Sequence, residues 1–333
     1  MLSEKSALEY KAVREGVGWY RLTLEESAFE MFGKDTVSFL HGMVSNDIKS
    51  LKEGSGCYAA CLTSTGKVLS DLRVYVLSNR LLILLPQKEK KKVLEHFEKF
   101  IFVEEVLFKD LERELNLFSV QGPLARKVIS DLLGKPLQLS NYEHALFQIG
   151  EISLRIIGAT HTGEEGFDIL ASPKDSSRFC GLLREKGKSY GIQEISEETL
   201  EVLRIEASIP RYGMEMDEST ILLEAGLEHA VSFAKGCYLG QEVIARIKHI
   251  GHVNRQLSGL ILSGSASKGD AVLYNEKEAG HVTSACYSPA VSSYVALAIL
   301  RREITLPKTP VIVKTSGSLQ QSTVASLPFY VRP

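Results

Sequence analysis

KGCYLGQE occupies residues 235–242 and places a single cysteine between two glycines. Glycine allows a left-handed backbone and the close approach of other segments, so we expect an open loop here. The next residues, QEVIARIKHIG, have the composition of a short helix whose free N–H groups and positive dipole end would face this loop. Lys235 stands two residues before Cys237, and such surroundings favour a reactive thiolate. The alternative is an inert, buried cysteine.

The other cysteines predict neither disulfides nor a metal site. They stand at positions 57, 61, 180 and 286, which makes the total of five odd and the spacing wide. Cys57 and Cys61 form a C-x3-C pair, but GCYAACLT is typical of a strand in which free cysteine acts as a small hydrophobe. We therefore expect reduced thiols and no bound metal.

The length of 333 residues predicts two or three domains with a substantial core. A formal net charge of −2 gives no global electrostatic reason to bind nucleic acid or an anionic membrane. The N-terminal stretch lacks the apolar region of a secretory signal, and the longest aliphatic run, LLILL at 81–85, is too short to cross a bilayer. These features favour a cytoplasmic protein with no membrane partner and no direct nucleic-acid partner.

Two α+β units and a separate set of strands follow one another along the chain. A helix capped by Asp35 precedes the strand-like runs CYAACLT, KVLSDLRVYVL and RLLILLP. Residues 115–207 repeat this alternation, which indicates two related layers that share a core. After Val253, short β-branched segments separated by turns predict a small antiparallel barrel or sandwich. We expect domains at residues 1–250 and 251–333.

Asp71 is the first candidate for ligand chemistry. In GKVLSDLRVY, strand alternation places Leu69, Asp71, Arg73 and Tyr75 on one face. A carboxylate in mid-sheet can bind a ligand amine or exchange a proton with it. An ion pair with Arg73 or another basic residue explains it equally well.

Glu206 is the second candidate, on a helix among Leu200, Leu203 and Ile205. A buried carboxylate is costly unless it receives hydrogen bonds, and the N–H and amino groups of a pterin edge would supply them. A salt bridge to Arg204 or Arg211 is the competing explanation, and the residues alone favour it somewhat.

Taken together, these stretches resemble the glycine-cleavage T-protein (aminomethyltransferase) superfamily. KGCYLGQE looks like the signature of its folate-binding YgfZ branch and matches it at every defined position. The defined positions are Lys235, Gly236, Cys237, Tyr238, Gly240, Gln241 and Glu242. Further stretches similar to superfamily landmarks occur in the family order from about Trp19 to the C-terminus: VSNDI, QGPLA, TGEEGFDIL, RIEASIPRYG, LLEAGL and GHVTSACYSP.

The resemblance implies an α+β fold of two mixed α/β subdomains plus a C-terminal antiparallel β-barrel, arranged around a central folate site. It implies tetrahydrofolate or a derivative as the ligand. It places Glu206 at the pterin edge and Asp71 near the reactive folate nitrogens, with Tyr75 a weaker match in the same strand.

One departure stands out. Aminomethyltransferases carry an asparagine after the third strand that helps to hold the folate, whereas this chain has LLPQ, with Pro86 at that place. Proline offers neither a side-chain amide nor a backbone N–H.

The signature and Pro86 together favour a folate-binding protein of the YgfZ type. Such a protein supports iron–sulfur cluster assembly or repair in client enzymes, including tRNA-modifying ones, and Cys237 would be its functional thiol. The alternative is an aminomethyltransferase of the glycine cleavage system, which moves a one-carbon unit from a lipoyl-bound amine to tetrahydrofolate. A third possibility is an interaction module that keeps folate only as a structural ligand. The residues alone leave open whether a substrate is turned over.

Overall fold

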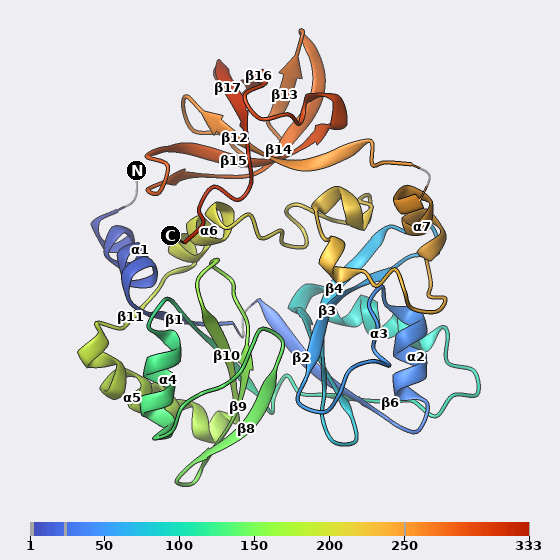
Figure 1. Cartoon of the computed structure of the whole chain (residues 1–333), viewed down its shortest axis with the longest axis vertical. Helices are drawn as coiled ribbons and strands as arrows, with labels where there is room; N and C mark the ends of the chain where they lie inside the picture. The colour runs from blue at the N-terminus through green and yellow to red at the C-terminus, as the bar shows by residue number, and fades with distance from the viewer. Residues whose placement is uncertain (1–2, 23–24, 250, 333) are drawn as a thin grey trace.

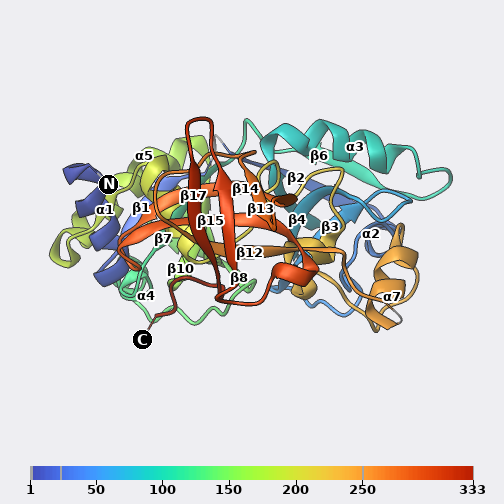
Figure 2. The same cartoon turned by 90° about the horizontal axis from the view of Figure 1, so that it is seen from above.

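Three bodies surround the middle of the molecule. The computed structural model describes residues 3–22, 25–249 and 251–332. Two bodies built of a sheet and helices lie side by side, and a barrel lies across them (Figures 1 and 2). The predicted fold class, two mixed α/β bodies plus a C-terminal antiparallel barrel, is confirmed.

The first body is a six-stranded sheet in the order β11-β1-β7-β10-β9-β8. Its strands are β1 (Gly18–Arg21), β7 (Asn116–Gln121), β8 (His144–Ile149), β9 (Ile152–Gly158), β10 (Gly166–Ala171) and β11 (Gln193–Glu194). Its helices are α4 (Ala125–Leu133) and α5 (Pro173–Gly187), followed by the 3₁₀ turn η2 (Lys188–Tyr190), and α1 (Glu4–Glu15) leads into β1. Trp19, Phe118, Phe167 and Phe179 form the centre of its core.

The second body is a five-stranded antiparallel sheet in the order β3-β4-β5-β2-β6. Its strands are β2 (Glu26–Phe32), β3 (Gly56–Leu62), β4 (Val68–Val76), β5 (Leu81–Pro86) and β6 (Leu107–Asp110). Its helices are α2 (Thr36–Met43) and α3 (Lys90–Glu98), the latter preceded by the turn η1 (Gln87–Glu89). Phe29, Phe39 and Phe97 are buried between this sheet and its helices.

The two sheets share a core, as the repeated alternation of strands and helices predicts. Tyr20 and Leu117 of the first sheet are buried in one cluster with Ala28, Tyr75 and Leu84 of the second. Where the two sheets face each other, Arg73 on β4 and Asp168 on β10 also make contact.

The third body is a closed antiparallel barrel in the order β12-β15-β14-β13-β16-β17. Its strands are β12 (Arg255–Leu262), β13 (Ala271–Tyr274), β14 (Lys277–Ser288), β15 (Ser293–Arg301), β16 (Pro310–Lys314) and β17 (Leu319–Ala325), with the turn η5 (Arg302–Ile304). The chain reaches it through α6 (Glu197–Glu206), η3 (Leu222–Ala225), η4 (Glu228–Ala230) and α7 (Gln241–His249). Residue 250, the expected domain limit, lies outside the described residues, as do residues 1 and 333 at the outer limits.

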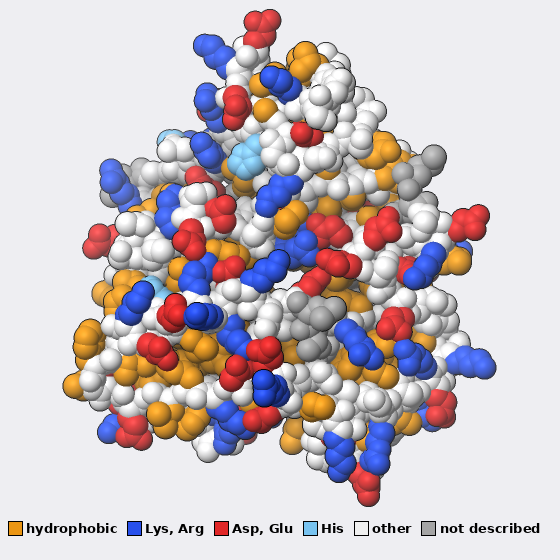
Figure 3. Space-filling view, turned by 180° about the vertical axis from the view of Figure 1, so that it is seen from behind, with side chains coloured by type: hydrophobic (Ala, Val, Ile, Leu, Met, Phe, Trp, Pro, Cys, Tyr) orange, Lys and Arg blue, Asp and Glu red, His pale blue; other side chains and the backbone are white. Residues whose placement is uncertain are grey.

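The surface carries charges of both signs. Figure 3 shows acidic and basic side chains interspersed over one face, which is hollowed near its middle between the three bodies. In the part of the chain that the structure describes, no helix is both long enough and apolar enough to cross a membrane.

Candidate functional site

Asp71 lies on β4 with one carboxylate oxygen free. Its Oδ2 accepts a hydrogen bond of 2.8 Å from the hydroxyl of Tyr58 on β3. Its Oδ1 is buried and has no hydrogen-bond partner among the described residues. Buried polar atoms in native structures are seldom left without a partner, so this unpaired oxygen marks Asp71 as a candidate for a ligand contact.

The surroundings of Asp71 change its acidity. The pKa of the carboxyl is raised to about 6, chiefly by burial and also by the nearby carboxylate of Glu26, while the Tyr58 hydroxyl and Arg73 act in the opposite direction. A carboxyl with this pKa exists in both protonation states near neutral pH. It can therefore take up and release a proton during a reaction.

Arg73 does not pair with Asp71, although the two stand two residues apart on the same strand. Its Nη1 donates to Asp168 Oδ2 on β10 at 2.8 Å, and its Nη2 contacts Glu26 on β2. The competing prediction, an ion pair between Asp71 and Arg73, is therefore wrong.

Tyr75 lies in the core shared by the two sheets and is fully buried. Its hydroxyl has no hydrogen-bond partner among the described residues. Burial raises its pKa well above the ordinary value of a tyrosine, so the hydroxyl stays protonated.

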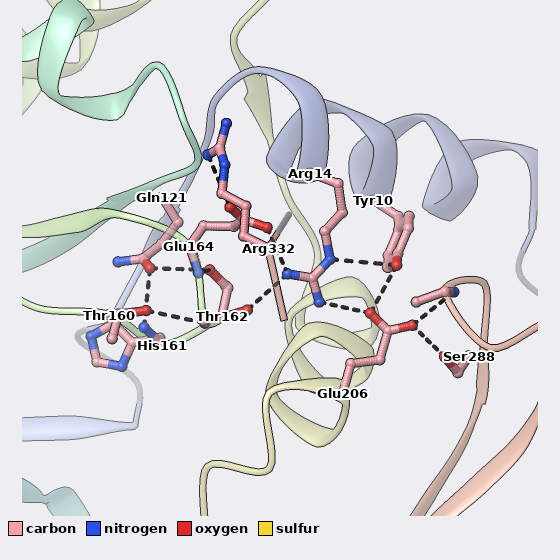
Figure 4. Close-up of polar contacts among 12 residues, drawn as sticks. Tyr10, Arg14, Gln121, Thr160, His161, Thr162, Glu164, Glu206, Ser288 and Arg332 are labelled. Carbon is pink, nitrogen blue, oxygen red and sulfur yellow. Dashed lines mark hydrogen bonds and ion pairs between the residues drawn. The ribbon is translucent and has the colours of Figure 1, made fainter. Parts of the chain in front are cut away.

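Glu206, at the end of α6, is fully enclosed by donors from the protein itself (Figure 4). Its Oε2 accepts from the Tyr10 hydroxyl at 2.8 Å and from Arg14 Nη2 at 2.7 Å. Its Oε1 accepts from the Ser288 hydroxyl and from the backbone N–H of Ala290 at 3.1 Å. A carboxylate offers about four lone-pair sites, and these contacts use all of them.

Arg14 extends this cluster to the C-terminal tail. It donates to Glu164 at 3.0 Å, and the ring of Tyr330 lies 3.7 Å from its guanidinium carbon. Arg332 contacts the other oxygen of Glu164 at 3.2 Å. The cluster thus joins α1, α6, the barrel and the C-terminal tail, which indicates an architectural role.

The partners of Glu206 were missed by sequence reasoning. The expected ones were Arg204 or Arg211, but Arg204 pairs with Glu201 and Glu215, and Arg211 pairs with Glu201. The only signal for Arg14 was its spacing of four from Tyr10 on a helix, and TGEEGFDIL, which contains Glu164, indicated only the superfamily.

The KGCYLGQE loop braces the second body. The Lys235 ammonium donates to the carbonyl of His41 and, at 2.7 and 2.8 Å, to those of Val44 and Asn46, at the end of α2. Gly240 has φ +82°, and a Cβ there would lie 2.4 Å from the carbonyl oxygen of Thr63.

The side chains next to Cys237 in the loop also have structural partners. Tyr238 lies under the Lys235 ammonium, and its N–H donates to Gln241 Oε1 at 3.2 Å. Packing therefore accounts for most of the signature.

Cys237 is exposed, four residues before α7 begins. The ammonium of Lys235, expected to favour its thiolate, is instead held by the three carbonyls. Burial raises the pKa of both Cys57 and Cys61 to about 12, as suits cysteines that fill a strand. Among the described residues, no group of three or more histidine, cysteine or acidic side chains could hold a metal ion.

Comparisons with known proteins cover nearly the whole chain. The model of the GCVT N-terminal domain matches residues 2–235, and that of the glycine cleavage T-protein C-terminal barrel domain matches residues 255–330. An aminomethyltransferase of Bacillus licheniformis is 29% identical over 97% of this chain and 90% of that protein. One from Desulfitobacterium hafniense is 31% identical over 89% of this chain and 81% of that protein.

The fold has a close counterpart among solved structures. The aminomethyltransferase T of the glycine cleavage system from Bartonella henselae superposes with a TM-score of 0.88, at 24% identity, over 98% of this chain and 90% of that one. This likeness concerns the fold.

These findings correct the function predicted from the octapeptide. The superfamily is confirmed, but the YgfZ-type role in iron–sulfur assembly, with its client enzymes and link to tRNA modification, is wrong. The relatives that match over most of the chain are named aminomethyltransferases, which favours the alternative reading. The octapeptide misled because its lysine and second glycine serve packing, and Pro86 merely ends β5 opposite Glu26.

Proposed function

The chain belongs to the glycine cleavage T-protein (aminomethyltransferase) family, and from this we propose that it transfers a one-carbon unit from a lipoyl-bound amine to tetrahydrofolate. The carbon forms bonds to two folate N–H nitrogens, while its bond to the donor amine and its bond to the lipoyl sulfur break. The two protons lost by folate are taken by the amine, which leaves as ammonia, and by the sulfur, which is left as a free thiol. The family membership and the aminomethyltransferases that match over most of the chain support this reading.

The observation that carries the proposal is the raised pKa and the unpaired carboxylate oxygen of Asp71. During the transfer, one of these proton movements is from a folate nitrogen to the departing amine. A carboxyl with a pKa of about 6 can carry that proton at neutral pH. Tyr58 fixes one of its oxygens at 2.8 Å, so the other oxygen is presented in a defined direction.

The residues predicted to bind folate differ in whether they have an atom available to contact it. The free Oδ1 of Asp71 is an acceptor for a ligand N–H. Glu206 has no acceptor left for a pterin edge, so we assign it an architectural role rather than a direct contact. Tyr75 is buried in the core shared by the two sheets, and its hydroxyl is unpaired among the described residues, so the proposal gives it no direct contact with the ligand. The proposal gives Cys237 no chemical step.

The activity is tested with an aminomethylated lipoyl carrier protein as donor. The purified protein should release ammonia only when both the loaded carrier and tetrahydrofolate are present. Omitting folate, or using a carrier without its lipoyl group, provides the controls. Calorimetry should show saturable binding of tetrahydrofolate to the same preparation. Folate binding without ammonia release would overturn the proposal and leave a folate-binding module.

A further inference from the structure

We propose that Asp168 is a positioning residue for the Asp71 site: it holds Arg73 toward the first sheet and so leaves the Asp71 carboxyl without a cationic partner. The inference rests on the proposed function for the claim that the Asp71 carboxyl takes part in catalysis. The contacts of Asp168 and Arg73 do not depend on whether the protein turns over a substrate.

An arginine in the position of Arg73 would ordinarily bind Asp71. The two residues are separated by one residue on β4, so their side chains leave the same face of the sheet. Tyr58 stands directly opposite Arg73 in the register of β3 and β4, yet its hydroxyl reaches diagonally to Asp71. A guanidinium on this face is therefore within reach of the carboxylate.

Arg73 is instead drawn across to the other sheet. Asp168 is fully buried on β10, and its Oδ2 lies 2.8 Å from Arg73 Nη1. His161 Nε2 lies 3.0 Å from Asp168 Oδ1, which fixes the orientation of that carboxylate. Glu26 binds the second nitrogen of the guanidinium. Two carboxylates thus neutralise Arg73 and use its fork of donors.

The charge that Asp71 experiences follows from this arrangement. The groups that face it are Tyr58 from β3, Glu26 from β2, Arg73 from β4 and Tyr142 from the segment before β8. Among these groups Arg73 is the only cation. Within the part of the chain that the structure describes, Asp168 contacts Arg73 and makes no contact with Asp71. A change at Asp168 would therefore reach Asp71 through Arg73.

The test measures the pKa of Asp71 directly, by NMR titration of protein labelled with ¹³C in the aspartate carboxyl groups. Asp71→Asn identifies the resonance. In Asp168→Asn, Arg73 is released from one carboxylate, and the pKa of Asp71 should fall by about 1 to 3, the usual effect of a cation at close range. Asp168→Glu keeps the charge and should restore the wild-type value. Asp175→Asn, at a buried aspartate on α5, should leave it unchanged.

A second pair of variants separates the route of the effect. If Arg73 transmits it, Asp168→Asn should no longer lower the pKa of Asp71 when Arg73 is also replaced by Met. An equal fall in that double variant, or no change in folded Asp168→Asn, would overturn the proposal.

If Asp168→Asn does not fold, Glu26→Gln releases Arg73 from a more exposed carboxylate. Its effect should shrink in the Arg73→Met background, where only the loss of the Glu26 charge remains, and an undiminished effect would reject the role of Arg73. Because none of these titrations requires turnover, their failure is distinguishable from a failure of the proposed transfer reaction.

Discussion

Arg14 Nη2 lies 2.7 Å from Glu206 Oε2, although 192 residues separate the two in the chain. Both side chains are almost entirely enclosed, with 6% and 0% of their surfaces exposed. Removing one partner of a buried ion pair leaves an uncompensated charge. This lowers the free energy of unfolding far more than the loss of one partner of a surface ion pair does. The pair is therefore a point at which the N-terminal helix is locked to the rest of the protein.

Arg14→Met should destabilise the protein by about 3–5 kcal/mol, because it strands Glu206 and Glu164 without their shared cation. Urea unfolding measures the change. Lys11→Met is the matched control on the same helix: Lys11 pairs with Glu15 at 3.7 Å in solvent, so its loss should cost less than about 1 kcal/mol. Similar losses in both variants would contradict the buried-lock interpretation.

Gly240 and Gly236, both in the octapeptide, should respond differently to alanine. Gly240→Ala should cost about 1–3 kcal/mol or more, because its φ is +82° and a Cβ would meet the Thr63 carbonyl. A Cβ at Gly236 would meet nothing within 4 Å, so Gly236→Ala should be nearly neutral. Thermal unfolding of the two variants checks this, and equal melting temperatures would refute the bracing role of the loop.

The acidity of Asp71 predicts how stability depends on pH. Its pKa is raised in the folded protein from 3.8 to about 6, so its contribution to stability is fully present below the ordinary value and is lost as pH rises through about 6. Asp71→Asn removes this dependence. Between about pH 4 and about pH 8, the free energy of unfolding of the variant should therefore improve relative to wild type by about 1–3 kcal/mol. A difference that does not vary with pH would mean that the carboxyl titrates normally.

Cys237 should be the first thiol to react with iodoacetamide in the native protein, because it is exposed. Cys57, Cys61 and Cys286 should label slowly until the protein is denatured, since burial raises the pKa of each to about 12. Peptide mass spectrometry locates the label. Cys237→Ala should keep the transferase activity, and loss of activity in this folded variant would restore a chemical role for the thiol.

Strand alternation predicted one face of the strand for Leu69, Asp71, Arg73 and Tyr75, while the complete fold was predicted from the resemblance to the superfamily. The alternation failed at Leu69, where a β-bulge pairs Cys61 with Ser70 and Leu62 with Val68. The residue between, Leu69, consequently packs with Leu72 and Val74 on the opposite side. A bulge depends on the partner strand, so one strand's pattern does not reveal it.

The site was predictable only where its chemistry is local. A carboxylate in mid-strand marked Asp71 as a candidate, but the pattern did not show which residue would take Arg73. That outcome depends on Asp168, 95 residues away on another sheet. For Glu206, local partners such as Arg204 were the natural expectation, and the tertiary fold supplied Arg14 instead. The octapeptide misled because Lys235 and Gly240, which were read as part of a functional signature, have structural contacts.

The most direct test of the account is the rate of ammonia release in a single turnover with aminomethyl-lipoyl carrier and tetrahydrofolate, compared between wild type and Asp71→Asn. General acid–base catalysis contributes about 10²–10⁴-fold, so the variant should be at least about 100-fold slower while it still binds folate. Asp175→Asn, a buried aspartate outside the site, should react at the wild-type rate. Turnover by Asp71→Asn at close to the wild-type rate would contradict the assignment of proton transfer to Asp71.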